Sequence, residues 1–499
     1  MQTSLLAFAK TTSVMVRYSL FTLLRHYFGQ IAFILLLGLT GVVTDLLPPV
    51  MALEERVGLA WLFHWRGAVP APAQVVVIAI DQASTRALGL PPKPDQWPRA
   101  LHARLVRQLA QAGAAVIAFD LLFDKASTSV QQDDALAAAM REANTVVLTE
   151  SLVQDQITIS DANGRQVAAA SIEKTTLPIT VLSEAALGTA PFPLPKNTRV
   201  DAAWFFKSSA GSIPMLPTLV LQLYAIDMYD RLHHLLQKED ADFAASLPAN
   251  HEALLHTGAV DKLAMQLRHY VYSHPVQSLH LLRAINTNVD INHQRQSVLR
   301  ALLGMYRGGE ARYLNFYGPP RSITTIPYHL ALQNQGVGSD IFRGKAIFIG
   351  YSAASISGQD RLRDDYDTVY SQEDGLHLSG VEIGATAFAN ALEERFIQPL
   401  DTFYRIGVLF AWGCLLALLC RACRLSRATL LLLLLTALYL WAALYLFIRH
   451  QLWLPMITPL LIQLPLALFG TTLLRYLATK KEQLHLQQAF SHFIPSSMV

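Results

Sequence analysis

Four long apolar stretches dominate the hydropathy pattern of the chain, one near the amino terminus and three close together near the other end. Each is long enough to cross about 30 Å of hydrocarbon as a helix. We predict membrane-spanning helices at residues 29–50, 402–422, 428–448 and 452–474. The last stretch contains three prolines, which membrane helices tolerate when neighbouring groups satisfy the freed carbonyls. The pattern predicts one span before, and three spans after, a large central domain.

Within the central region, residues 51–401, short and continuously apolar runs alternate with segments of helical spacing. The predicted strands are residues 74–80, 114–119, 145–148 and 344–350, and the predicted helices between them are residues 98–111 and 133–142. Strands that are apolar on both faces and alternate with helices are typical of a mostly parallel sheet covered by helices. We therefore predict an α/β domain with a mostly parallel sheet, interrupted by a helical insertion at residues 216–307.

The composition agrees with a membrane protein. Charged residues make up 15 % of the chain, compared with roughly 25 % in a typical soluble domain, and the 52 % apolar content excludes disorder as the main state. The net charge of only +3 gives no general attraction to phosphate, so we predict no nucleic-acid partner. The three cysteines lie in or just inside the second predicted span, so the central domain must be stabilised by its core rather than by disulfides.

Basic residues predict the orientation in the membrane. They flank the first span, fill the short loop between the second and third spans and follow the fourth, whereas the opposite short loop has only Arg449. The flanking residues are Lys10, Arg17, Arg25, Arg421, Arg424, Arg427, Arg475, Lys480 and Lys481. Because basic loops stay in the cytoplasm, we predict that residues 1–28 and 475–499 are cytoplasmic and residues 51–401 extracytoplasmic. The first apolar stretch exceeds the core of a secretory signal, which favours an uncleaved anchor.

Acidic residues follow several of the predicted strands. Asp81 and Asp120 end two of them, Asp124 comes shortly after, and Asp360 lies in an acidic segment with Asp364, Asp365 and Asp367 after the last strand. The carboxyl edge of an open α/β sheet is where ligands bind. Capping of helices and turns also explains aspartate at strand ends and is the favoured interpretation of these residues.

Catalytic and metal-binding motifs are missing from the central region. The sequence Gly350-Tyr351-Ser352 lacks the glycine that a nucleophile elbow needs, because Ala354 stands there. Five histidines between residues 251 and 280 have spacings of 5, 13, 5 and 6, which do not favour metal ligation. We predict no catalytic residue, no metal and no cofactor.

Several stretches, taken in order, resemble the type-2 CHASE domain, an extracellular sensory module of bacterial adenylate cyclases, histidine kinases and serine/threonine kinases. They are residues 77–81, Trp97-Pro98-Arg99 with His102, residues 113–120 followed by Leu122-Phe123, Asp133 with the helix after it, and residues 315–320, 325–328, 342–350 and 379–385. The sequence after Asp360 departs from the family, which usually has Thr-Pro shortly after this aspartate.

The resemblance implies a bacterial inner-membrane receptor, most simply a homodimer in the lipid bilayer. Its external domain would bind an unidentified ligand or protein through residues such as Asp81, Arg99, Asp120, Asp124 and Asp360. Residues 489–499 resemble the linker that enters a class III cyclase domain, so the resemblance implies the input half of a cyclase whose output lies beyond Val499.

Two other interpretations remain open at this stage. One is a stand-alone membrane scaffold whose external domain holds a partner and has no catalytic output. The other is a transporter, suggested by the proline-broken fourth span. Against it, the predicted spans carry no charged residue near the bilayer centre, where substrate and ion sites are expected.

Overall fold

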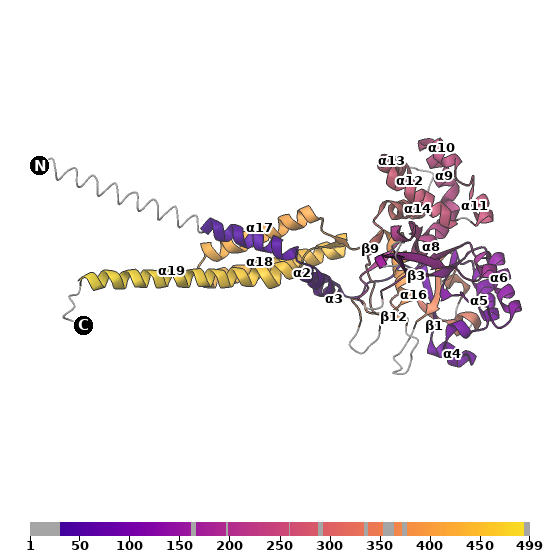
Figure 1. Ribbon diagram of the computed structural model, residues 1–499, viewed down its shortest axis with the longest axis horizontal. Coiled ribbons are helices and arrows are strands. Elements are labelled where there is room, and N and C mark those ends of the chain that lie inside the picture. Colours follow the sequence, from indigo (N-terminus) through magenta and orange to yellow (C-terminus); the bar gives the residue numbers. More distant parts are fainter. Residues whose placement is uncertain are drawn as a thin grey trace. The chain divides into compact units, whose positions relative to one another are not determined.

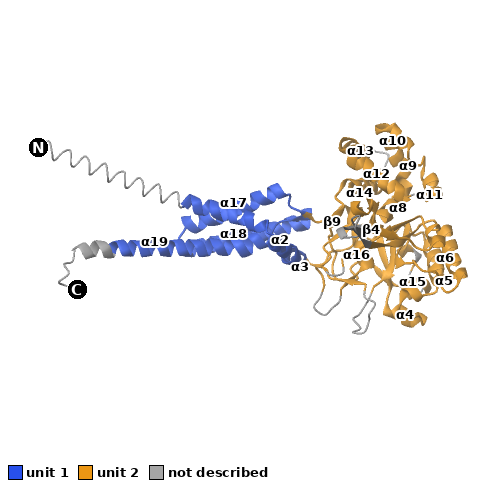
Figure 2. Cartoon of the chain, viewed as in Figure 1, with its two compact units in different colours: residues 1–66, 399–499 blue, residues 67–398 orange. Residues whose placement is uncertain are grey.

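The computed structural model describes residues 30–160, 166–195, 198–258, 260–287, 293–333, 338–352, 364–371 and 377–493 (Figure 1). The chain forms two compact units, shown in different colours in Figure 2. Residues 67–398 form one of them, which we call the α/β unit, and residues up to 66 together with those from 399 onward form the other, the membrane bundle. Residues 51–66, which the sequence analysis placed in the external domain, therefore belong to the membrane bundle.

A mostly parallel sheet forms the centre of the α/β unit, as predicted. Its strand order is β10-β1-β11-β2-β3, and every neighbouring pair in this order is parallel. The strand β5 pairs in parallel with β3, which then extends beyond the sheet and pairs antiparallel with β4. These strands are β1 (Val75–Ile80), β2 (Val116–Leu122), β3 (Val146–Ser160), β4 (Gln166–Thr176), β5 (Gly188–Pro191), β10 (Thr325–Pro327) and β11 (Ala346–Tyr351).

Helices cover both faces of the sheet. On one face, Ile78, Phe119 and Ile349 share a core with Leu105 and Leu136 from the covering helices. That face is covered by α4 (Gln82–Leu88), α5 (Arg99–Gln111), α6 (Val130–Ala143), α7 (Thr180–Ser183) and α15 (Tyr328–Gln333). The opposite face packs against α8 (Leu216–Tyr224) and α16 (Gly380–Glu393). Burial on both faces explains why the strand sequences are continuously apolar.

The region predicted as a helical insertion consists of helices, but its first helix, α8, packs on the sheet itself. The others are α9 (Tyr229–Glu239), α10 (Ala241–Ala245), α11 (His251–Thr257), α12 (Val260–Ser273), α13 (Pro275–Thr287) and α14 (His293–Arg307). Short helical turns are η2 (Pro94–Gln96), η3 (Ser208–Ala210), η4 (Ile226–Met228) and η5 (Ser339–Ile341). Two-stranded ladders join β6 (Ala202–Trp204) to β9 (Ala311–Tyr313), β7 (Phe206–Lys207) to β8 (Ile213–Pro214), and β12 (Asp365–Tyr366) to β13 (Leu378–Ser379).

Among the described residues of the membrane bundle, three helices are long and apolar enough to cross a membrane. They are α17 (Thr402–Ala422), α18 (Leu425–His450) and the continuous run of η6 (Thr458–Gln463) into α19 (Leu464–Phe493). The predicted first span differs from these three helices. The helix Gln30–Asp45 bends by 75° into the segment Pro48–Arg66, and the two arms are long and apolar enough to cross a membrane only when they are counted together. A fourth span is thus not confirmed.

The second arm of this bent pair comprises α2 (Pro48–Leu53), η1 (Glu54–Gly58) and α3 (Leu59–Arg66). Pro48 is the first residue of α2, a position where proline favours the start of a helix. Phe63 of α3 packs edge-on against Phe447 of α18, with ring centroids 5.1 Å apart. Short strands β14 (Gln398–Pro399), at the boundary of the two units, and β15 (Leu452–Trp453) complete the secondary structure.

Two buried carboxylates hold the start of the last span. Glu54 accepts hydrogen bonds from the indole Nε1 of Trp453 at 3.1 Å and from the backbone N–H groups of Met456 and Ile457 at 2.8 and 2.7 Å. Asp45 pairs with Arg405 at 2.6 Å and accepts a bond from the Thr458 hydroxyl at 3.3 Å. The predicted span at 452–474 therefore begins later, at residue 458, after a non-helical turn whose N–H groups are bonded to Glu54.

The other end of the bundle is basic. Arg475 of α19 donates hydrogen bonds of 2.6 Å to the carbonyls of Cys420 and Cys423, where α17 ends. A helix leaves its last carbonyls without partners inside the helix, and an arginine side chain here both satisfies them and opposes the negative end of the helix dipole. The turn between α17 and α18 and the Arg475 turn of α19 thus lie at the same end.

Candidate functional site

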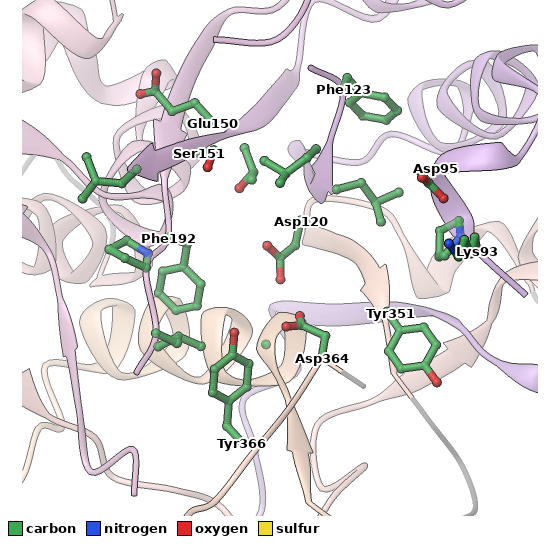
Figure 3. A pocket seen from close by; sticks show the side chains of 18 of the residues that line it. Lys93, Asp95, Asp120, Phe123, Glu150, Ser151, Phe192, Tyr351, Asp364 and Tyr366 are labelled. Atoms are coloured by element: carbon green, nitrogen blue, oxygen red, sulfur yellow. The ribbon is translucent and has the colours of Figure 1, made fainter. Parts of the chain in front are cut away.

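A cavity of about 730 Å³ opens at the carboxyl ends of β2, β3 and β11. After β2 the chain continues to α6 on one face of the sheet, whereas after β11 it continues to α16 on the other face. Neighbouring strands whose connections leave to opposite faces create a crevice at the sheet edge, where open α/β folds bind ligands. We call this the switch-point cavity. It is lined by residues 93–95, Arg99, 120–123, 149–152, 192–194, Tyr351, Asp364, Tyr366 and Gly380 (Figure 3).

Two half-buried aspartates, Asp120 and Asp364, face each other in the cavity (Figure 3). Their Oδ2 atoms lie 3.3 and 2.4 Å from the point that a Cβ atom on Gly380 would occupy. Tyr366 hydrogen bonds to Asp364, and burial together with the charge of Asp364 raises the pKa of this tyrosine. From the sequence, Asp120 was expected at the end of its strand, but β2 continues two residues further, to Leu122.

Close packing fixes the start of α16 beside these carboxylates. A Cβ atom on Gly350 would lie 2.8 Å from the Cβ of Val381 and 3.2 Å from that of Asp120, so only glycine allows β11 to approach both. Ser379 and Glu382 form a reciprocal capping box at the first turn of α16. Glu382 also accepts a hydrogen bond from the buried Ser352 hydroxyl at 3.4 Å.

Arg99 contributes a buried cation to the cavity wall and is only 4 % exposed. Its Nε lies 3.6 Å from Asp133 Oδ1, and its guanidinium carbon lies 4.3 Å from the centroid of the Phe123 ring. Burial lowers the pKa of Arg99, and the nearby Asp133 opposes this change. The charge of Arg99 is therefore balanced within the wall, and the arginine fixes Phe123 at the cavity edge.

Behind this wall, the Trp97 and His102 positions of the sequence motif form part of the core. The Trp97 and His102 rings are stacked with centroids 6.3 Å apart, and His102 Nδ1 lies 2.9 Å from the Tyr328 hydroxyl. Burial and the positive charge of Arg99 lower the pKa of His102 to about 3. His102 is therefore neutral at any physiological pH and acts in packing.

The other predicted ligand contacts have different positions. Asp81 is buried and caps α4, because its Oδ1 accepts bonds of 2.8 Å from the backbone N–H and the hydroxyl of Ser84. It also pairs with Arg321 at 3.0 Å and borders a separate pocket of about 380 Å³. Asp124 is exposed and is not among the residues that line the switch-point cavity. Asp360 lies outside the described residues. The structure thus brings Arg99 and Asp120 to the cavity and gives Asp81 a capping role.

Residues that the sequence analysis did not select complete the lining. Thr149 and Glu150 are buried in β3, and the half-buried Phe192 follows β5. The Thr149 hydroxyl is buried and has no hydrogen-bond partner among the described residues. Thr149 and Glu150 directly follow the predicted strand 145–148. They would have been found if the two residues after each predicted strand had also been considered as site residues. Among the described residues, no group of three or more histidine, cysteine or acidic side chains is arranged to hold a metal ion.

Comparison with protein families identifies the chain. The family model of the CHASE2 domain matches residues 31–420, which is more than three quarters of the chain. The chain belongs to the CHASE2 family. CHASE2 domains are sensory modules of signalling proteins, and the α/β unit with its switch-point cavity lies within the matched region. No curated protein and no solved structure matches the chain.

Glu150 gives the CHASE2 domain a titratable group at neutral pH. The residue is only 8 % exposed, and burial, with a smaller contribution from the negative charge of Asp261, raises its pKa to about 7. A hydrogen bond with Thr175 opposes this change. Because the folded pKa lies above the ordinary value of 4.5, the folded state binds the Glu150 proton more tightly than the unfolded state does between these two values.

We therefore expect Glu150 to make the folded domain less stable as pH rises from about 4.5 to 7. The loss of unfolding free energy attributable to Glu150 is about 2 kcal/mol between pH 5.5 and 8. The unfolding temperature of the wild type, measured from pH 5.5 to 8, should fall relative to that of Glu150→Gln. The variant should therefore be more stable than the wild type at the higher pH. Glu142→Gln, which removes an exposed carboxylate paired with Arg107, is the matched control. Parallel pH profiles for wild type and Glu150→Gln would contradict the raised pKa.

Proposed function

We propose that this chain is the sensory input half of a bacterial transmembrane receptor. In this proposal, the α/β unit lies outside the cytoplasm, the switch-point cavity binds a small ligand, and the membrane bundle relays the change to a cytoplasmic output. The output that we propose is a class III adenylate cyclase. The observation that carries the proposal is a cavity at the topological switch point of a CHASE2 domain, in a chain whose described residues also include three helices of membrane-spanning length.

The distribution of charge in the bundle supports the proposed orientation. Arg475 contacts the carbonyls at the end of α17, so the basic turns around residues 421–427 and 475–481 belong to one end of the bundle. Short basic segments favour the cytoplasmic side. The first helical residues of α17 and the paired Asp45 and Arg405 belong to the opposite end. The chain enters and leaves the α/β unit from that end, which is consistent with an extracytoplasmic sensor.

The continuity of the last span supports the relay. Glu54, in the arm that precedes the α/β unit, is bonded to the turn that starts the last span. From there α19 runs without interruption to Phe493. A change in the arm can therefore reach the far end of α19 through one buried contact and one helix. The resemblance of residues 489–499 to the linker of class III cyclases supports the proposed output.

One experiment tests location and relay together. A class III cyclase catalytic domain is joined after Val499, the three native cysteines are replaced by alanine, and Leu122→Cys is introduced. Leu122 lines the switch-point cavity and is 44 % exposed. A bulky, membrane-impermeant maleimide added to intact cells should label this cysteine and change cyclic AMP production at least twofold, because it occupies the cavity from outside.

Lys238→Cys is the matched control. Lys238 is exposed near the end of α9 and does not line the cavity, so it should be labelled equally well and leave cyclic AMP unchanged. Labelling of either cysteine only after cell lysis would refute the extracytoplasmic location. Labelling of Leu122→Cys without any change in cyclic AMP would refute the relay from the cavity.

A further inference from the structure

Two cysteines lie where α17 ends, and two residues separate them in the sequence. Cys420 belongs to the last turn of α17, and Cys423 directly follows the final helical residue, Ala422. Both are free thiols in the structure. Pairs with this C-x-x-C spacing are common in thiol–disulfide chemistry. Whether these two thiols can react with each other depends on the geometry of the turn that carries them.

The backbone brings the two cysteines within reach of a disulfide. The N–H of Cys423 donates a hydrogen bond of 3.3 Å to the carbonyl of Leu419, so the helical path continues up to Cys423. Three steps along a helix separate two Cα atoms by about 5 Å, and a disulfide spans roughly 4.4–6.8 Å. The Cβ atoms of such a pair lie about 5–6 Å apart, but a disulfide needs roughly 3.5–4.5 Å. A disulfide would therefore distort the last turn of α17.

The two thiols differ in their access to solvent. Cys420 is only 1 % exposed, whereas Cys423 is half-buried. Reactive cysteines are typically partly exposed and close to basic side chains, and Cys423 is followed in the sequence by Arg424 and Arg427. An oxidant from solvent would therefore meet Cys423 first, and Cys420 would supply the second thiol from within the bundle.

The same turn is bonded to the last span. A single nitrogen of Arg475, Nη2, donates hydrogen bonds of 2.6 Å to the carbonyls of both Cys420 and Cys423. Because one nitrogen reaches both oxygens, the two bonds require the two carbonyls in their present positions. A disulfide between the same two residues moves these carbonyls, and the contact with Arg475 is weakened.

We propose that Cys420 and Cys423 form a reversible disulfide in response to a hydroperoxide, and that the disulfide loosens Arg475 from the end of α17. The thiol of Cys423 takes one oxygen as the O–O bond breaks, which gives a sulfenic acid and releases water or an alcohol. The thiol of Cys420 then attacks this sulfur, so that the S–S bond forms and water leaves. The two thiols lose two electrons, which the hydroperoxide gains. A dithiol restores both thiols by exchange, and strained disulfides are the ones that are most easily reduced.

This inference goes beyond the proposed function, because it gives the membrane bundle a second input that does not involve the switch-point cavity. In the proposed orientation, this end of the bundle faces the cytoplasm. Cytoplasmic disulfides are usually transient, and many of them are redox-sensing. The test below measures the bond itself rather than cyclic AMP, so that it does not depend on an output domain.

The first experiment detects the disulfide. The full chain in lipid nanodiscs is treated with hydrogen peroxide and analysed by peptide mass spectrometry without reduction. We expect a bond between Cys420 and Cys423 within one chain, which dithiothreitol reverses. Cys414→Ala is the matched control and should form the same bond at the same rate, whereas Cys423→Ala should leave the buried Cys420 reduced.

The second experiment measures the coupling to Arg475. The chain is equilibrated with mixtures of reduced and oxidised dithiothreitol, and the equilibrium constant for the disulfide is determined. If the disulfide weakens the Arg475 contact, the contact must oppose the disulfide by the same factor. We expect Arg475→Ala to favour the disulfide by at least about fivefold, the lower end of typical couplings. Lys480→Ala removes an exposed basic residue from the same helix and should leave the constant unchanged.

Three results would overturn the inference. They are the absence of a Cys420–Cys423 disulfide after peroxide treatment, a bond that joins Cys423 of two copies instead, and equal equilibrium constants for Arg475→Ala and Lys480→Ala. If Arg475→Ala does not fold, Arg475→Gln should favour the disulfide in the same direction, and an unchanged constant in this variant would also overturn the inference. A failure of the proposed sensory function would appear separately, in the labelling of Leu122→Cys.

Discussion

Replacing Glu54 with alanine is expected to destabilise the membrane bundle by about 3–9 kcal/mol. The Glu54 carboxylate is the acceptor for three donors, the Trp453 indole and the backbone N–H groups of Met456 and Ile457. All three donor residues are at least nine-tenths buried, so water cannot replace the lost acceptor at low cost. Each unsatisfied donor costs roughly 1–3 kcal/mol, which gives the expected total.

The measurement is the unfolding temperature of the full chain in nanodiscs, together with tryptophan fluorescence, because the Trp453 indole loses its acceptor. Glu54→Gln keeps one acceptor oxygen and should show a smaller loss than Glu54→Ala. Glu55→Ala removes the same side chain from the neighbouring, half-buried position and serves as the matched control. Equal losses for Glu54→Ala and Glu55→Ala would show that the contacts of Glu54 do not hold the start of the last span.

The second large effect is expected for Gly350→Val in the sheet. A Cβ atom at this position would lie 2.8 Å from the Cβ of Val381 and 3.2 Å from the Cβ of Asp120. Both neighbours are attached directly to backbone, so they cannot turn aside as the end of a long side chain could. Overpacking of this kind usually costs 1–3 kcal/mol, and the branched valine places this variant at about 3 kcal/mol.

Gly338→Val is its control, since a Cβ atom on Gly338 would have no heavy atom of the described residues within 4 Å. We expect Gly350→Val to lower the unfolding temperature of the full chain, because the start of α16 must move away from β11. Gly338→Val should leave the unfolding temperature unchanged. An unchanged unfolding temperature in Gly350→Val would mean that α16 and β11 do not pack as closely as described.

Much of the sheet could be predicted because its strands are buried on both faces. The predicted strands at 74–80, 114–119 and 344–350 differ from β1, β2 and β11 by at most three residues at either end. The extension of β3 to Ser160 and its pairing with β4 were missed. Beyond Thr149 its sequence mixes polar and apolar residues, because this part leaves the sheet that is covered on both faces.

The order of the strands could not be predicted, and this order creates the site. The strand β11 lies between β1 and β2, although it follows β2 by more than two hundred residues along the chain. This insertion sets Gly350 opposite Asp120 in register and brings Tyr351 to the cavity. A search for acidic residues at strand ends finds Asp120 but not the other residues that line the cavity. It finds Asp81 equally, although the carboxylate of Asp81 already accepts a hydrogen bond from Ser84.

The uninterrupted length of α19 has a mechanical consequence. Its 30 residues make a rod about 45 Å long, half as long again as the hydrocarbon layer of about 30 Å. It is held at two points, by the Glu54 contacts just before residue 458 and by Arg475, which is bonded to the end of α17. The 18 residues beyond Arg475 therefore project about 27 Å as a single helix. A pivot of only about 5° at Arg475 would move their far tip sideways by about 2 Å, given the helical rise. Any tilt at this point thus produces its largest displacement at residue 493.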